Sequence, residues 1–184
     1  MARKSSKEIF ADTIQELAKA AAVDKITVKQ IVEKSGLSLQ TFYNHFKDKS
    51  ELILYIHKSA GDSMIAKLGK DGYGYRELTE ENIRFYIDHK DFFYNALTNT
   101  YGLDSYAEQC ARNAYTVWTK YLTKKKKVDK LPEDIDFLLK MYCFAFTRMI
   151  AEWAFRRNDI SPERFIELMN AAMPGKLRPY LLKA

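Results

Sequence analysis

The scarcity of glycine and proline is the feature that most constrains how this chain can fold. Its 184 residues include only seven glycines and four prolines. Strict alternation of apolar and polar residues, the pattern of a half-buried strand, is hard to find, whereas apolar residues recur at the 3.6-residue spacing of an α-helix. Since 47% of the residues are hydrophobic, the chain can bury a sizeable core. The sequence therefore predicts an all-α fold.

Capping signals place four helices in the first third of the chain. Three of them are opened by a side chain that can bond the free backbone N–H groups of a helix start. The predicted helices are residues 6–22, a second opened by a Thr27/Gln30 capping box and ended by Gly36, a third over 39–46 capped by Ser38, and a fourth over 49–67 opened by Asp48 and Glu51.

A glycine-rich stretch, residues 68–78, predicts a boundary between two parts of the chain. Beyond it we expect further helices, each with its own start signal. They cover residues 79–89 with a break near Asp91 and a continuation to 97, residues 105–122 opened by a Ser105/Glu108 capping box, residues 133–157, and a last helix opened by Ser161 and Pro162. We predict a three-helix domain over residues 1–50 and a larger helical domain over 51–184, linked by the helix 49–67.

Composition excludes several classes of protein. Cys110 and Cys143 are far apart and lie outside any CxxC pattern, which favours two reduced core thiols over a disulfide scaffold. The basic start lacks the apolar run of a signal peptide, and no stretch approaches eighteen consecutive apolar residues. We expect a soluble cytoplasmic protein with no membrane partner. Its net charge of +6 is compatible with a polyanionic partner.

Catalytic patterns are missing as well. His45, His57 and His89 are isolated, and no metalloprotease, nucleophile-elbow or Walker pattern occurs. We therefore expect no enzyme, no metal and no cofactor. The lysine run 124–127 could contact nucleic acid or form a solvated helix end, and Arg3 with Lys4 could form a basic arm or a frayed terminus.

The stretch "GLSLQTFYNHFKDKSEL", residues 36–52, carries the functional signal. On a helical wheel Phe42 and Phe46 fall together, while Gln40 and Asn44 stack on the opposite side. A helix, a tight turn with Gly36 and a second helix form a helix-turn-helix, whose second helix enters the DNA major groove. Gln and Asn can bond the edge of adenine bidentately. A helical hairpin with a solvated polar face has the same wheel, so geometry alone leaves both readings open.

A family resemblance adds to this reading. "ITVKQIVEKSGLSLQTFYNHFKDKSELI", residues 26–53, closely resembles the DNA-binding region of TetR/AcrR-family transcriptional regulators. "IDHKDFFYNAL" and "AEWAFRRNDISPERFIELM" are similar to a subgroup that regulates dihydroxyacetone-kinase operons. The resemblance implies a homodimer that binds double-stranded operator DNA, a repressor released by an unknown small-molecule effector. The alternative is a helical protein-interaction or co-regulator module that responds to a protein partner. Neither the effector, the operator, the target genes nor the sign of regulation follows from the sequence.

The resemblance also implies roles for individual residues near DNA. Those at base-facing positions are Leu39, Gln40, Thr41 and Asn44. Those at phosphate-facing positions are Thr27, Lys29, Tyr43, His45 and Lys49. Leu39 could touch a thymine methyl group or belong to the core.

The larger domain is rich in aromatic residues, which can line a ligand pocket or simply fill a helical core. The candidate pocket residues are Phe85, His89, Phe93, Asn113, Trp118, Tyr142 and Arg148. Residues 135–153 are apolar on more than one face, so that helix must be buried on two sides. In the resembled family the last two helices pair across a two-fold axis. The expected dimer-interface residues are Phe144, Trp153, Phe165, Leu168, Met169 and Ala172.

Overall fold

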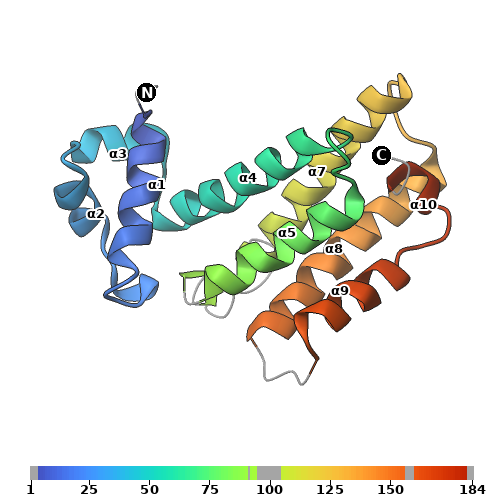
Figure 1. Ribbon diagram of the computed structural model, residues 1–184. Helices are drawn as coiled ribbons and strands as arrows, with labels where there is room; N and C mark the ends of the chain where they lie inside the picture. The colour runs from blue at the N-terminus through green and yellow to red at the C-terminus, as the bar shows by residue number, and fades with distance from the viewer. Residues whose placement is uncertain (1–3, 91, 95–104, 156–159, 182–184) are drawn as a thin grey trace.

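The computed structural model describes residues 4–90, 92–94, 105–155 and 160–181 (Figure 1). Within these residues the secondary structure is helical throughout and contains no strand, so the all-α prediction is confirmed. The elements are α1 Ser6–Leu17, η1 Val23–Lys25, α2 Val28–Ser35, α3 Leu39–His45, α4 Lys49–Lys67, α5 Tyr75–Asp88, α7 Tyr106–Lys126, α8 Glu133–Phe155, α9 Pro162–Ala171 and α10 Arg178–Leu181.

Helices α1 to α3 form a small head at one end of the molecule, and α5 and α7 to α10 form a larger body (Figure 1). Helix α4 runs from the head into the body, where it packs along α7. Within the described residues, no helix has both the length and the apolar content that crossing a bilayer requires.

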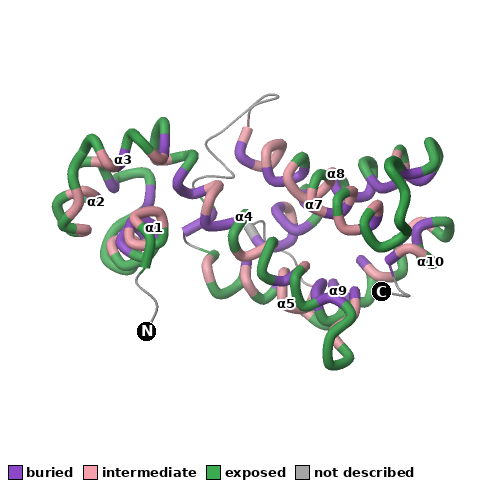
Figure 2. The backbone as a smooth tube through the Cα atoms, turned by 90° about the horizontal axis from the view of Figure 1, so that it is seen from above, coloured by how far each residue is buried: buried purple, intermediate pink, exposed green. Residues whose placement is uncertain are grey.

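Buried side chains form two clusters. Figure 2 shows which parts of the backbone carry buried residues. The first contains Phe10 and Phe42 of the head together with Trp153 of the body. The second fills the far half of the body around Leu139 and Leu177. Residues on both sides of residue 50 thus share one core cluster, and the division of the chain at that point stays a prediction.

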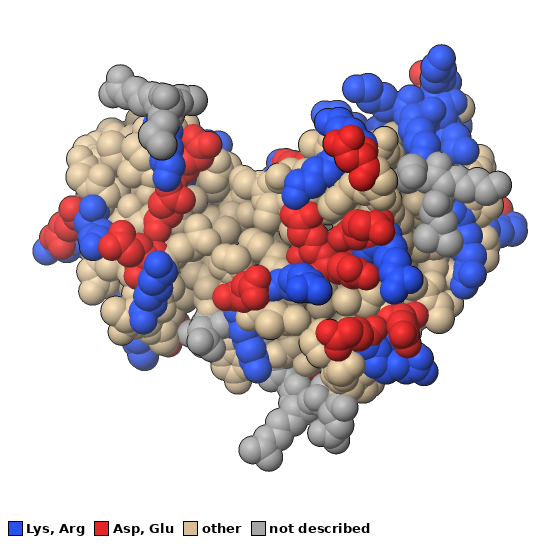
Figure 3. Space-filling model, viewed as in Figure 1, with Lys and Arg blue, Asp and Glu red and all other residues tan. Residues whose placement is uncertain are grey.

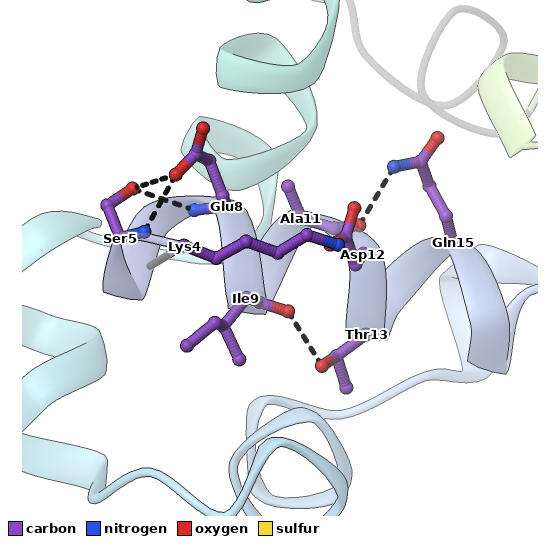
Figure 4. A network of polar contacts seen from close by, with 8 residues as sticks. All are labelled: Lys4, Ser5, Glu8, Ile9, Ala11, Asp12, Thr13 and Gln15. Atoms are coloured by element: carbon purple, nitrogen blue, oxygen red, sulfur yellow. Dashed lines mark hydrogen bonds and ion pairs between the residues drawn. The ribbon is translucent and has the colours of Figure 1, made fainter. Parts of the chain in front are cut away.

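The predicted helix 6–22 is shorter in the structure, where α1 ends at Leu17. Its start is fixed by a capping box between Ser5 and Glu8: the Ser5 amide donates to the Glu8 carboxylate at 2.7 Å (Figure 4). Lys4 pairs with Asp12 at 2.6 Å on the same helix, so it does not form a free arm. Beyond the end of α1 the chain turns into η1, and Ala21, which the predicted helix included, is exposed.

The other start signals of the head are confirmed. Thr27 and Gln30 form the predicted capping box, and the helix they open ends at Gly36, whose φ of +70° lies in the left-handed region that favours glycine. Ser38 accepts from the amide of Thr41 at 3.0 Å. Asp48 accepts from the amide of Glu51, also at 3.0 Å. Local capping chemistry thus sets the boundaries of α2, α3 and the start of α4.

One helix start in the body differs from the prediction, and a second helix lacks its predicted capping box. Helix α5 begins at Tyr75 instead of Thr79, because the Gly74 amide donates to the Glu77 carboxylate and a first turn forms before Thr79. Ser105 caps α7 as expected, but the carboxylate of Glu108 bonds Arg112 rather than completing a capping box. The predicted break near Asp91 and the loop at 98–104 lie outside the described residues.

The C-terminal helices begin where the sequence predicted. Helix α8 starts at Glu133, directly after Pro132. Ser161 caps α9 by accepting from the amide of Arg164 at 3.2 Å, with Pro162 in the first turn. The lysine run that ends α7 is exposed and lies at the end of the molecule away from the head (Figure 3). That position separates it from α3 and favours the solvated-end reading.

Candidate functional site

The buried face of α3 fixes this helix to the head. Phe42 and Phe46 are almost fully buried. Their rings lie 5.2 and 6.4 Å from the ring of Phe10 on α1, both edge to face. Aromatic pairs of this geometry add about 0.5–1.5 kcal/mol each beyond the area they bury. The predicted orientation of α3, aromatics inward, is confirmed.

The outward face of α3 carries the two amides. Gln40 and Asn44 are exposed, and Gln40 Nε2 donates to Asn44 Oδ1 at 2.9 Å. This contact holds the two side chains side by side, one helical turn apart, with donors and acceptors still facing solvent. Leu39 is 50% exposed on the same helix, which excludes its core reading. Thr41 is half-buried and bonds Ser38 through its hydroxyl at 2.8 Å.

The residues expected to face phosphates lie on or near α3, but they differ in their exposure and in the groups they contact. Tyr43 is 53% exposed at the helix surface. Thr27 is exposed while its hydroxyl takes part in the capping box of α2. Lys29 pairs loosely with Glu33 at 3.8 Å on the solvent side of α2. His45 is half-buried with its ring against Phe46.

Lys49 has a partner set that the sequence did not predict. Its ammonium donates to the carbonyl oxygens of Val23, Asp24 and Ile26 at 2.7, 3.1 and 2.7 Å. An ammonium has three donors, so all of them are engaged within the head. Burial also lowers the pKa of Lys49. Lys49 therefore ties η1 to the start of α4, and a phosphate contact by Lys49 stays a prediction that requires it to give up one of these carbonyls.

Helix α4 connects the head to a cavity in the body. Its first half contributes Leu52, Ile53 and Ile56 to the cluster shared with the head. Its second half, from His57 onward, lines a cavity of about 80 Å³ bounded also by α5, α7 and α8. The lining residues are His57, Gly61, Met64, Ile65, Tyr75, Leu78, Asn82, Tyr86, Asn113, Ala114, Val117, Trp118, Tyr142, Cys143, Phe146, Thr147 and Ile150.

The structure places three of the seven predicted pocket residues on this cavity: Asn113, Trp118 and Tyr142. The other four do not line this cavity, and their role in binding an effector stays a prediction. The rings of Phe85 and Phe93 pack on each other at 5.3 Å. His89 bonds the backbone oxygen of Phe85 and faces an outer groove. Arg148 is exposed and pairs with Glu152 one turn along α8.

The cavity receives polar residues from α4 and α5 that are not among the predicted pocket residues. His57 was regarded as isolated, yet it lies one turn before Gly61, which lines the same wall. Asn82 and Tyr86 repeat this spacing on α5. Spacings of four residues on two neighbouring helices were the available signal. These spacings do not show which way the side chains face, however, until the packing of the helices is known.

The cysteines are structural. Cys110 and Cys143 are both buried and unpaired. Burial raises the pKa of each thiol to about 12, so neither is a thiolate near neutral pH. Among the described residues, no group of His, Cys, Asp and Glu is placed to hold a metal ion.

Comparison with known proteins follows this division into head and body. The model of bacterial regulatory proteins of the tetR family matches residues 15–56. The model of a transcriptional regulator C-terminal region matches residues 75–175, which is more than half of the chain. The chain belongs to the TetR family of transcriptional regulators. Members of this family are generally regulators without enzymatic activity.

Individual TetR-family relatives agree with this assignment. The dhaKLM operon transcriptional activator DhaS of Lactococcus lactis subsp. lactis (strain IL1403) is 27% identical over 92 residues, which are 50% of this chain and 48% of DhaS. The chain thus spans about half the length of the curated relatives it matches. The predicted similarity to regulators of dihydroxyacetone-kinase operons is confirmed.

Solved TetR-family structures share the fold over nearly the whole chain. A dihydroxyacetone kinase operon activator DhaS has a TM-score of 0.64 at 19% identity, over 95% of this chain and 97% of that one. A TetR transcriptional regulator from Rhodococcus sp. RHA1 has a TM-score of 0.63 at 13% identity, over 91% and 96%. At such identities the likeness concerns the fold alone.

TetR-family regulators function as dimers, and α8 and α9, the helices predicted to form the dimer interface, carry exposed apolar side chains. On α8, Phe137, Met141 and Met149 are 67%, 49% and 47% exposed. On α9, Leu168 is 39% exposed. The predicted Phe144 is half-buried and Ala172 exposed, so both are accessible from outside.

Three predicted interface residues, Trp153, Phe165 and Met169, are buried within the chain itself, and their place at a dimer interface stays a prediction. Trp153 stacks on Phe165 with ring centroids 4.5 Å apart, and its indole N–H donates to the backbone oxygen of Ile160. Met169 is also buried, and its carbonyl accepts from the hydroxyl of Tyr142 at 3.2 Å. These contacts hold α9 against α8 within one chain.

Proposed function

We propose that this protein is a homodimeric repressor that binds operator DNA through α3 and is released when a small molecule occupies the cavity behind α4. The observation that carries the proposal is the orientation of α3. Gln40 and Asn44 point outward as an adjacent amide pair, while Phe42 and Phe46 anchor the helix to α1. Such amides can read adenine in the major groove.

Helix α4 supplies the connection between the two activities. One helix contributes Ile53 and Ile56 to the cluster shared with the head and His57 and Gly61 to the cavity wall. A ligand that moves the cavity part of a rigid helix also moves the two recognition helices of a dimer relative to each other. Spacing between half-sites decides binding to a two-fold symmetric operator, so this movement would release the DNA.

Selection of duplexes from a random pool, followed by affinity measurements against salt, tests the DNA-binding part. Asn44→Ala is expected to cost roughly 1–3 kcal/mol on the selected duplex and less on random DNA. Tyr43→Phe on the same helix is the matched control: it removes the hydroxyl that would bond a phosphate, so both duplexes should be weakened equally. An Asn44→Ala variant that keeps its full preference for the selected duplex rejects base reading by this residue.

A second reading, in which a protein partner supplies the signal, is favoured by the size of the cavity. Its volume of about 80 Å³ lies below the roughly 300 Å³ where most ligand pockets begin. A promoter fusion in cells, with the purified protein screened in parallel against small metabolites, separates the readings. The direction of the change in promoter activity also distinguishes repression from activation. This distinction matters because the related DhaS is named an activator.

A further inference from the structure

The walls of the cavity carry no formal charge. Among the described residues that line it there is no Lys, Arg, Asp or Glu. Its polar groups are the imidazole of His57, the amides of Asn82 and Asn113, the hydroxyl of Thr147 and neighbouring tyrosine hydroxyls. Burying a carboxylate, phosphate or ammonium without an opposite charge is far more costly than burying a neutral polar group. The cavity therefore selects against charged ligands.

His57 is the group that lacks a partner. Its side chain is 8% exposed, and its Nδ1 atom has no hydrogen-bond partner among the described residues. Aromatic rings surround the imidazole, with Tyr86 at 5.6 Å and Tyr106 at 6.2 Å between centroids. A buried polar atom without a partner is rare in native structures and destabilising. A ligand that bonds this nitrogen would remove that penalty.

The chemistry of a neutral imidazole narrows the ligand further. Burial lowers the pKa of His57 to about 4, so near pH 7 the ring has one donor nitrogen and one acceptor nitrogen. A hydroxyl group can both donate and accept, and therefore matches Nδ1 in either tautomer. A carbonyl, which only accepts, or an ammonium, which only donates, would match one tautomer only.

Size sets the upper limit. The cavity of about 80 Å³ is roughly half of the 150 Å³ that holds benzene in an engineered apolar cavity. Two features of the wall allow moderate widening. A Cβ atom added at Gly61 would meet no atom within 4 Å. Met64, on the same side, has a flexible side chain that can adapt to a ligand. One ring is the largest group that this arrangement takes.

We infer that the cavity binds a small uncharged hydroxy compound of at most one ring, with its hydroxyl group hydrogen-bonded to His57. The inference rests on the proposed function, in which this cavity receives the effector, and it adds the chemical class of that effector.

Three probes of one ring test the class on the full-length protein at pH 7 in the absence of DNA: phenol, toluene and benzoate. Calorimetry should show phenol binding about three- to tenfold more tightly than toluene, the effect of one net hydrogen bond. Benzoate should not bind, because its carboxylate finds no cation. Equal binding of phenol and toluene, tighter binding of benzoate, or no binding of phenol overturns the inference.

Three variants locate the contact. His57→Leu should remove the preference for phenol over toluene, whereas His89→Leu, a histidine off the cavity wall, should keep it. Gly61→Leu places a side chain in the open space and should abolish the binding of phenol and toluene. If His57→Leu retains the phenol preference while Gly61→Leu binds none of the probes, another wall residue makes the hydrogen bond and the inference fails for His57.

Operator binding distinguishes this inference from the proposed function. If phenol binds with the expected preference but does not release the protein from its selected DNA, the ligand class is supported. The same result rejects the cavity as the effector site. Operator binding with no phenol binding rejects the ligand class and leaves DNA recognition intact.

Discussion

The head and helices α8 and α9 of the body are both built on aromatic anchors, yet only the head could be oriented from its sequence. Helix α3 has one apolar side, formed by Phe42 and Phe46, and its remaining surface is polar. Helix α3 can therefore pack against the head in only one orientation. Helix α8 is apolar nearly all round, and two of its faces could meet the core of its own chain. An amphipathic pattern determines orientation only when a single face is apolar.

The largest test of this comparison uses two phenylalanines with opposite exposure. Phe165 is 2% exposed and Phe137 67%. Phe165→Ala should lower the free energy of unfolding by roughly 3–5 kcal/mol, because it leaves a cavity beside Trp153. Phe137→Ala should leave chain stability nearly unchanged and shift the dimer toward monomer. Denaturant unfolding and sedimentation velocity measure the two effects separately.

If Phe137→Ala sediments as an unchanged dimer, and a Met141→Asp variant does too, the outer face of α8 is not the interface. The dimer would then have to form elsewhere. Equal decreases in stability for both phenylalanine variants would instead show that Phe137 is covered within its own chain, contrary to its exposure.

This difference also explains which parts of the molecule the sequence predicted. The caps at Thr27, Ser38, Asp48 and Ser161 were predicted correctly because each depends on residues three apart. The end of the first helix was placed at residue 22 instead of Leu17, since no capping glycine marks it and the turn that follows depends on the packing of η1 near the start of α4. The cavity was predicted only in part because its wall comes from four helices whose relative rotation is a property of tertiary packing.

The second test concerns His57, the polar group enclosed by the body. Burial lowers its pKa from 6.5 to about 4. Between these values the unfolded chain holds a proton on His57 that the folded chain lacks, so falling pH favours unfolding. The contribution of neutral His57 to the free energy of unfolding is fully present above about pH 6.5. It declines as the pH falls toward 4, by about 3 kcal/mol in total.

Denaturant unfolding at pH 7 and pH 5, compared between the wild type and His57→Leu, isolates this contribution from that of the carboxylates. The wild type should lose more stability than the variant over this interval. Parallel curves for the two proteins would mean that His57 takes up its proton at the same pH in both states.

The third test concerns Lys49 and its bonds within the head. Lys49→Met keeps most of the side chain and removes the charge-assisted hydrogen bonds to Val23 and Ile26, which should cost roughly 1.5–3 kcal/mol of stability. Lys47→Met, an exposed neighbour, serves as the control and should be nearly neutral. Thermal unfolding gives the stability, and the salt dependence of DNA binding gives the number of phosphates that the protein neutralises.

If the Lys49 ammonium stays bonded to its carbonyl partners in the DNA complex, the dependence of DNA affinity on salt should be the same for Lys49→Met and the wild type. A slope shallower by roughly one unit for each phosphate that the variant no longer neutralises shows instead that Lys49 moves to a phosphate on binding. The measurement thus decides between the structural role and the role implied by family resemblance.

The smallest expected effect comes from Ser38, whose hydroxyl caps α3. Ser38→Ala removes the bond to the Thr41 amide and should destabilise this seven-residue helix by about 1 kcal/mol. Ser59→Ala in the middle of α4 is the control, where alanine is the better helix former. Hydrogen exchange of the α3 amides should report the destabilisation, and affinity for selected and random DNA should fall by the same factor. A change in base preference would show that Ser38 reads a base, and α3 would then lie deeper in the groove than the exposure of Gln40 and Asn44 indicates.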